Sequence, residues 1–167
     1  MKSLPQIVQA LVDAEVGFVL VGGFAVQLHG FIRSTLDIDL VVAMDDTNLS
    51  KFVEVCKSFG LAPVIPAPID ALKNAAQIEQ WHREKGMLAF ALREPGVAGS
   101  VIDVLVRSDV SYERLMTQAV MMPLFGRQVA TASIDHLLEM KRVANRPKDR
   151  LDIDALEKIK QGLPPNV

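Results

Sequence analysis

The chain has 167 residues, half of them hydrophobic, and a formal net charge of −2. This length predicts one compact domain over 1–167, in which residues 133–161 form a C-terminal helical part that completes a cleft. The charge excludes the broad electropositive surface of a non-specific duplex binder but leaves room for a local basic groove. No apolar stretch approaches the roughly 20 residues of a membrane span, and no signal region is visible. We therefore expect a cytoplasmic protein with no membrane partner.

The N-terminal third alternates between helical and extended patterns. Its hydrophobic period predicts a helix over 3–14, capped by Ser3, and then a strand over 18–21. A short helix over 24–29 and a second strand over 37–43 follow. These elements lead into the segment that carries most of the polar motifs.

The middle of the chain is less regular. A third helix is predicted to begin at a Thr47 or Asn48 cap and to reach Phe59. Cys56 lies on the apolar face of that helix and has no second thiol for a disulfide, which predicts a buried core residue. Three prolines after position 62 then interrupt the pattern, and only a polar helix over 77–85 is predicted before the next strands.

The next segment carries strand and hairpin signals. Strands are predicted over 87–92 and 100–107, joined by a glycine-containing hairpin loop. A helix over 112–119 and a hairpin that turns at 125–127 follow. Asp103 is alone in the middle of an apolar strand, where burial of a carboxylate without a partner is costly. A structural accident is therefore not the favoured explanation of Asp103.

Two helices close the chain and place polar residues on their apolar faces. After the cap Ser133, the helical period puts Lys141 on the apolar stripe, so it should point inward or toward a cleft. In the last helix Leu151 and Asp152 fall on the inner face together with Lys148. With Arg146 and Asp149 adjacent, these polar residues are typical of the rim of an anion-binding site. The alternatives are a lysine at the edge of the core and a simple intrahelical pair between Lys148 and Asp152.

The most informative motif couples a glycine pair to an acidic pair. Asp37 and Asp39 are two positions apart in a strand, so both carboxylates lie on one face. Like charges this close repel, which favours a cation between them. Upstream, Gly22 and Gly23 end an apolar strand and open a helix, where backbone N–H groups can approach an anion. Metal and phosphate in one place indicate nucleotide chemistry.

These motifs together resemble a known superfamily. The glycine pair, the run Arg33-x-Thr35-x-Asp37-Ile38-Asp39 and the isolated Asp103 resemble the nucleotidyltransferase superfamily that includes DNA polymerase beta. The segment from Ser133 to Lys141 and the run Arg146-Pro147-Lys148-Asp149-x-x-Asp152 resemble the C-terminal motif of its AbiEii-type branch. That branch is associated with the abortive-infection toxins of bacterial toxin–antitoxin systems. The resemblance spans residues 18–156 and has no recognisable motif in 61–86.

The resemblance implies an α/β (α+β) fold, in which helices flank a mixed β-sheet and further helices stand at the C-terminus. It also implies Mg²⁺-dependent transfer of a nucleoside monophosphate from an NTP, by resemblance ATP, to a hydroxyl on RNA, protein or a small molecule. Asp37, Asp39 and Asp103 would be the catalytic residues and would hold two Mg²⁺ ions, or Mn²⁺ in their place. A cognate antitoxin is a further implied partner. The residues expected to bind the nucleotide and its phosphates are Gly22, Gly23, Arg33, Ser34, Thr35, Lys141, Lys148 and Asp152.

One position departs from the superfamily pattern. Many members have serine after the first glycine, where its hydroxyl contacts a phosphate, and this chain has Gly23. Ser34 or Thr35 could supply the hydroxyl instead.

Two alternatives to the enzyme remain. One is a non-catalytic nucleotide-binding protein or toxin–antitoxin partner of the same fold, against which the intact acidic triad argues. The other is a structural domain with merely solvated carboxylates, which metal-dependent stabilisation by an NTP would rule out.

Overall fold

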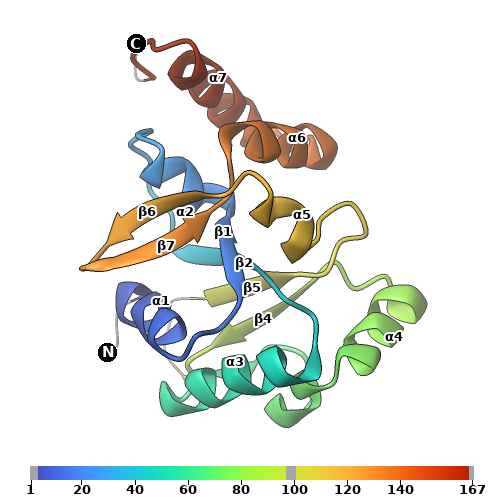
Figure 1. Cartoon of the computed structure of the whole chain (residues 1–167). Coiled ribbons are helices and arrows are strands. Elements are labelled where there is room, and N and C mark those ends of the chain that lie inside the picture. The colour runs from blue at the N-terminus through green and yellow to red at the C-terminus, as the bar shows by residue number, and fades with distance from the viewer. Residues whose placement is uncertain (1–3, 97–100, 166–167) are drawn as a thin grey trace.

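The computed structural model describes residues 4–96 and 101–165, and within them seven strands form one mixed sheet (Figure 1). The strand order is β3-β4-β5-β2-β1-β7-β6. The strands are β1 Phe18–Val21, β2 Asp37–Val42, β3 Ala62–Pro63, β4 Ala89–Arg93, β5 Val101–Leu105, β6 Val120–Leu124 and β7 Arg127–Thr131. The helices are α1 Leu4–Asp13, α2 Gly22–Leu28, α3 Asp46–Ser58, the 3₁₀ helix η1 Ile69–Lys73, α4 Ala75–Lys85, α5 Tyr112–Met116, α6 Ile134–Ala144 and α7 Asp149–Lys160. The predicted mixed sheet flanked by helices is confirmed.

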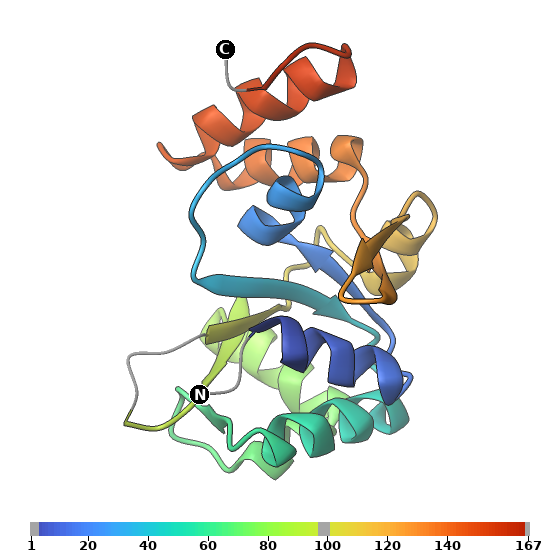
Figure 2. The same cartoon turned by 90° about the vertical axis from the view of Figure 1, so that its left-hand side faces the viewer.

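The helices lie on both sides of the sheet. Figure 2 shows α1, α3 and α4 on one side and α2, α6 and α7 on the other. Side chains alternate along a strand, so Ile38 and Leu40 of β2 point to one face of the sheet. Asp37 and Asp39 point to the other face. The first face packs against α3, where the ring of Phe52 meets that of Phe90 of β4 edge-on, with centroids 6.5 Å apart. This apolar layer frees the opposite face for polar residues.

Strand pairing determines which polar residues meet. Strands β2 and β5 are parallel, with Asp39 opposite Asp103, although more than sixty residues of chain separate them. Strands β1 and β2 are antiparallel, with Val21 opposite Asp39, so the chain leaves β1 for Gly22 directly beside that aspartate. The glycine turn, Asp39 and Asp103 therefore lie next to one another on three adjacent central strands.

The predicted cap of α3 was wrong. Asp45 caps the helix, because its side chain accepts a hydrogen bond from the backbone N–H of Asn48 at 2.9 Å. Asn48 is instead buried, where its amide bonds the backbone of Gly17 and of Ala43. Tertiary hydrogen bonds thus gave Asn48 a different role from the one that capping preferences predict.

Other element boundaries also moved. The proline-rich segment contains β3, an edge strand paired with β4, and the helix η1, neither of which the residue pattern predicts. Strand β4 begins at Ala89, two residues after its predicted start. The helix predicted over 112–119 ends at Met116. The predicted cap Ser3 and the predicted strand start at 100 lie outside the described residues.

Burial confirms one core prediction and contradicts another. Cys56 is fully buried, and burial raises the pKa of its thiol to about 12. Leu151, expected on the inner face of α7, is 69% exposed, because α7 packs on α6 through Ala155 and Leu156 instead. Within the described part of the chain, no helix combines the length and apolar character that crossing a membrane requires.

Candidate active site

A cleft of about 800 Å³ lies on the polar face of the sheet, lined from β2, β5, the β1–α2 junction, the loop before β2, and α6 and α7. Its volume is within the range of roughly 300–1,000 Å³ that is typical of small-molecule sites. The cleft brings together every residue that the sequence motifs single out. These lining residues are Gly22, Gly23, Arg33, Ser34, Thr35, Asp37, Asp39, Asp103, Lys141, Lys148 and Asp152.

Three carboxylates form the floor of the cleft. Asp37 and Asp39 lie on one face of β2, and Asp103 lies beside Asp39 on the parallel strand β5. Burial raises the pKa of Asp39 to about 6, and the charges of Asp103 and Asp37 add to the rise. Burial and the charge of Asp37 also raise the pKa of Asp103. Ionisation of Asp39 and of Asp103 therefore costs free energy, and a cation at this position would relieve that cost.

The carboxylates have the chemistry of a magnesium site but are not drawn together. Across the described residues, no three Asp, Glu, His or Cys side chains surround a common metal position. Carboxylate oxygens are hard ligands that suit Mg²⁺, so Asp37, Asp39 and Asp103 are the residues present that fit the ion.

Neighbouring side chains leave little room for a Cβ at either residue of the glycine pair. Gly22 has φ +66°, and a Cβ there would fall 1.9 Å from Oδ2 of Asp39. A Cβ at Gly23 would meet the guanidinium carbon of Arg33 at 3.0 Å and the hydroxyl of Thr35 at 3.2 Å. A side chain at position 23 would therefore be in tight contact with Arg33 and Thr35, which would have to shift slightly. The side chain of Thr35 donates to the carbonyl of Asp37 at 3.2 Å.

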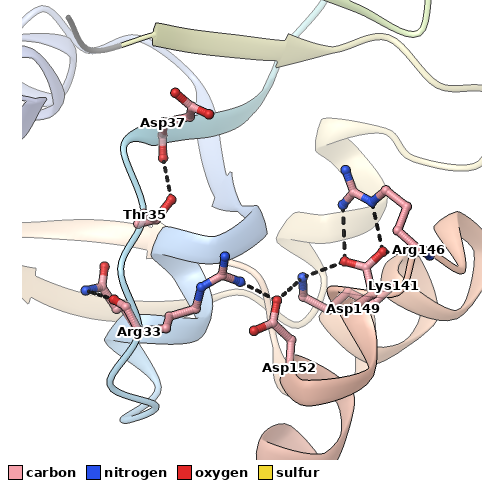
Figure 3. A network of polar contacts seen from close by, with 8 residues as sticks. Arg33, Thr35, Asp37, Lys141, Arg146, Asp149 and Asp152 are labelled. Atoms are coloured by element: carbon pink, nitrogen blue, oxygen red, sulfur yellow. Dashed lines mark hydrogen bonds and ion pairs between the residues drawn. The ribbon is translucent and has the colours of Figure 1, made fainter.

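A network of alternating charges forms the wall opposite the floor (Figure 3). Lys141 of α6 is buried, and its Nζ lies 2.6 Å from Oδ2 of Asp152 and 3.3 Å from Oδ1 of Asp149. Asp152 also accepts a hydrogen bond from Arg33, which reaches across from the loop before β2. Nε of Arg146 donates to Oδ2 of Asp149 at 2.9 Å. The buried carboxylates Asp149 and Asp152 thus hold Arg33, Lys141 and Arg146 and tie α6 and α7 to the loop before β2.

Two residues of this wall differ from their predicted arrangement. Lys148 lines the cleft but is exposed, and Asp152 pairs with Lys141 and Arg33 rather than with Lys148. The sequence pattern places Asp149 only next to the predicted anion-binding residues. In the structure its side chain is 1% exposed and bonds both Lys141 and Arg146. Burial opposes its ionisation, but hydrogen bonds from Arg146 and the charge of Lys141 lower its pKa to about 2. The sequence feature that could have identified Asp149 is its spacing of three residues from Asp152, which places both on one face of the helix.

Comparison of the structure identifies the architecture. The crystal structure of LnuA, a lincosamide antibiotic adenylyltransferase, is 16% identical with a TM-score of 0.59, and the match covers 92% of this chain and 94% of LnuA. ANT(2″)-Ia is 11% identical with a TM-score of 0.58, covering 96% and 90%. The chain has the nucleotidyltransferase fold. An antigenic nucleotidyltransferase-like protein from Paracoccidioides brasiliensis is also similar, at 19% identity and a TM-score of 0.52, covering 92% and 72%. No family model and no curated sequence matches the chain.

In this nucleotidyltransferase fold, the strand order arranges the cleft from one side to the other. The glycine turn follows β1, Asp39 lies on β2, Asp103 on β5, and Leu88 and Ala89 mark the start of β4. The acidic floor therefore lies between a glycine end and a more apolar end.

Proposed function

We propose that the protein transfers a nucleoside monophosphate from an NTP, ATP by resemblance, to a hydroxyl group and releases pyrophosphate. The observation that carries the proposal is the meeting of Asp37, Asp39 and Asp103 with the Gly22–Gly23 turn in one cleft. Two neighbouring aspartates of β2 and one from the distant strand β5 would supply hard oxygen ligands beside a turn without side chains. The nucleotidyltransferase fold of the chain supports the same reaction class.

The acidic floor has the central role in this proposal. Asp37, Asp39 and Asp103 would hold Mg²⁺, which when bound stabilises the charge that develops on the transferring phosphoryl group. Asp103 is the carboxylate farthest from the glycine turn in strand order, and its pKa is raised by burial and by Asp37. It is therefore suited to accept the proton of the attacking hydroxyl.

The glycine pair and the cations of the cleft would bind the phosphates. Gly22 and Gly23 line the cleft where α2 begins, and their backbone N–H groups would approach the phosphates because neither residue carries a Cβ. Lys141 and Lys148 line the same cleft and would stabilise negative charge on the departing pyrophosphate. Arg33 and Thr35 lie against position 23, where many superfamily members have serine, and would contact phosphate in its place. Asp152 would orient Lys141 and Arg33.

The acceptor is a hydroxyl-bearing molecule in this proposal. LnuA is described with lincomycin bound, and ANT(2″)-Ia with adenylyl-2″-tobramycin, so the fold accommodates small molecules in such reactions. A cognate antitoxin stays a prediction of the AbiEii-type resemblance, and a cytoplasmic location stays a prediction from the hydrophobic pattern of the sequence.

Pyrophosphate release from each of the four NTPs tests the proposal. The assay contains Mg²⁺ and a panel of RNA, protein and small hydroxyl acceptors. We expect release with the parent protein and a loss of at least about 100-fold in Asp37→Asn/Asp39→Asn, because the variant lacks two of three metal ligands. Asp154→Asn, which replaces an exposed carboxylate of α7, is the matched control. Turnover that survives loss of both aspartates would overturn the proposal, as would absence of Mg²⁺–NTP binding.

A further inference from the structure

The cations of the cleft are already neutralised by the protein. Arg33, Lys141 and Arg146 are paired with Asp152 and Asp149 in the wall network. Arg107, which lines the cleft beyond β5, donates from Nε to Oδ1 of Asp109 at 2.9 Å.

Among the described residues that line the cleft, Lys148 is the cation without a salt bridge. Among the described residues the three floor carboxylates have no salt bridge either, and in the proposed function they hold Mg²⁺. A nucleic-acid acceptor gains most of its affinity from lysines and arginines that neutralise its phosphates. Once a triphosphate occupies Lys148, no unpaired cation is left in the cleft for a phosphate backbone.

The exposed rim of the cleft also carries aliphatic side chains. Three aliphatic side chains line it while remaining largely open to water: Leu36 is 77% exposed, Leu88 59% and Val143 61%. They come from three separate elements, which are the loop before β2, the start of β4, and α6. Single exposed aliphatic residues are common, but three around one concave site are characteristic of ligand binding.

The strand order shows where Leu88 and Leu105 lie relative to Asp103 and the glycine turn. Leu88 stands at the start of β4, on the far side of Asp103 from the glycine turn, and Leu105 lies opposite Ala89 in the cleft floor. An acceptor whose hydroxyl reaches Asp103 would therefore rest its remaining atoms on this side. The phosphates of the nucleotide would lie at the other end.

We propose that the acceptor is a small, phosphate-free hydroxylated molecule with an apolar face, which Leu36, Leu88 and Val143 bind beside Asp103. This inference rests on the proposed function, because it assigns the second substrate of the same cleft. The apolar residues supply affinity by leaving water, and the described cations that line the cleft are either paired with carboxylates or assigned to the phosphates of the nucleotide. RNA is thereby the disfavoured acceptor class.

The test measures binding of chosen probes to the full chain loaded with Mg²⁺ and α,β-methylene-ATP. The probes are n-octyl-β-D-glucoside below its critical micelle concentration, glucose, and a 20-nucleotide single-stranded RNA, in 150 mM salt. Saturation-transfer NMR titration gives each Kd. We expect the octyl glucoside to bind at least tenfold more tightly than glucose, and the RNA not to bind measurably. Burial of about 60 Å² of apolar surface is sufficient for that factor.

Matched variants connect the binding to the cleft. Leu36→Asn/Leu88→Asn should abolish the preference for the glucoside and leave the affinity for α,β-methylene-ATP unchanged. Val64→Asn/Leu163→Asn replaces two exposed aliphatic residues outside the cleft lining and should change neither affinity. All four positions are exposed, so the variants should fold like the parent.

Each outcome decides between the two proposals. Equal binding of glucose and octyl glucoside, or RNA binding that weakens steeply with salt, would overturn the apolar acceptor. A glucoside preference that persists in Leu36→Asn/Leu88→Asn would overturn the assigned site. Failure of the parent to bind α,β-methylene-ATP in calorimetry would overturn the nucleotidyltransferase proposal itself, whatever the probes do.

Discussion

Gly22 has the least room for change among the residues of the cleft. Its φ of +66° disfavours any L side chain, and a Cβ would overlap the carboxylate of Asp39 at 1.9 Å. Gly22→Ala must therefore displace Asp39 or the turn. Positive φ alone costs about 1–2 kcal/mol, and we expect a loss of unfolding free energy above that range, measured by urea denaturation.

A second glycine separates the two causes. Gly126 has a similar φ of +75°, with nothing within 4 Å of its ideal Cβ. Gly126→Ala should therefore show only the backbone cost and keep full pyrophosphate release, whereas Gly22→Ala should lose it. Equal stability losses in the two variants would contradict the predicted overlap with Asp39.

At the level of elements, Asp152 joins three parts of the structure. It lies on α7, is 3% exposed, and pairs with Lys141 of α6 and with Arg33 of the loop before β2. Asp152→Asn leaves buried cationic charge less well compensated, and breaking a buried pair typically costs about 3–5 kcal/mol. We expect a loss of about 2–4 kcal/mol of unfolding free energy, because Asp149 still neutralises Lys141. Asp154→Asn, exposed on the same helix, should stay within about 0.5 kcal/mol of the parent in the same denaturation experiment.

For the whole molecule, the acidic floor makes the stability of the metal-free protein depend on pH. Burial, with Asp103 and Asp37, raises the pKa of Asp39 in the folded state from 3.8 to about 6. A raised folded-state pKa means that this contribution to stability is fully present below pH 3.8 and is lost as pH rises through about 6. Two pKa units correspond to roughly 3 kcal/mol.

Asp39→Asn should remove this dependence. In EDTA we expect the variant to unfold with about 2–3 kcal/mol more free energy than the parent at pH 8, and with the same free energy near pH 4. Mg²⁺ should then stabilise the parent at pH 8 and the variant much less, because a ligand of the folded state raises stability by mass action. Denaturation curves that differ equally at both pH values would show that Asp39 ionises without cost.

Local residue patterns were enough to predict the glycine turn, the Asp37–Asp39 pair and the inward position of Lys141. Each depends on the steric preferences of glycine or on the period of one strand or helix, which act over a few residues. Pro63 of β3 shows the limit of such rules, since pairing with β4 made an edge strand where the composition indicates a break.

The charge network required the folded chain. Arg33 and Asp152 are 119 positions apart, and no period or spacing connects them. Lys141 meets Asp149 across the turn between two helices, a contact that depends on how α7 packs against α6. Short-range sterics decide the conformation of each segment, whereas burial of the shared apolar core decides which segments meet. The candidate ligands were therefore readable along the chain, but their partners and the aliphatic rim of the cleft became visible only when the core had brought them together.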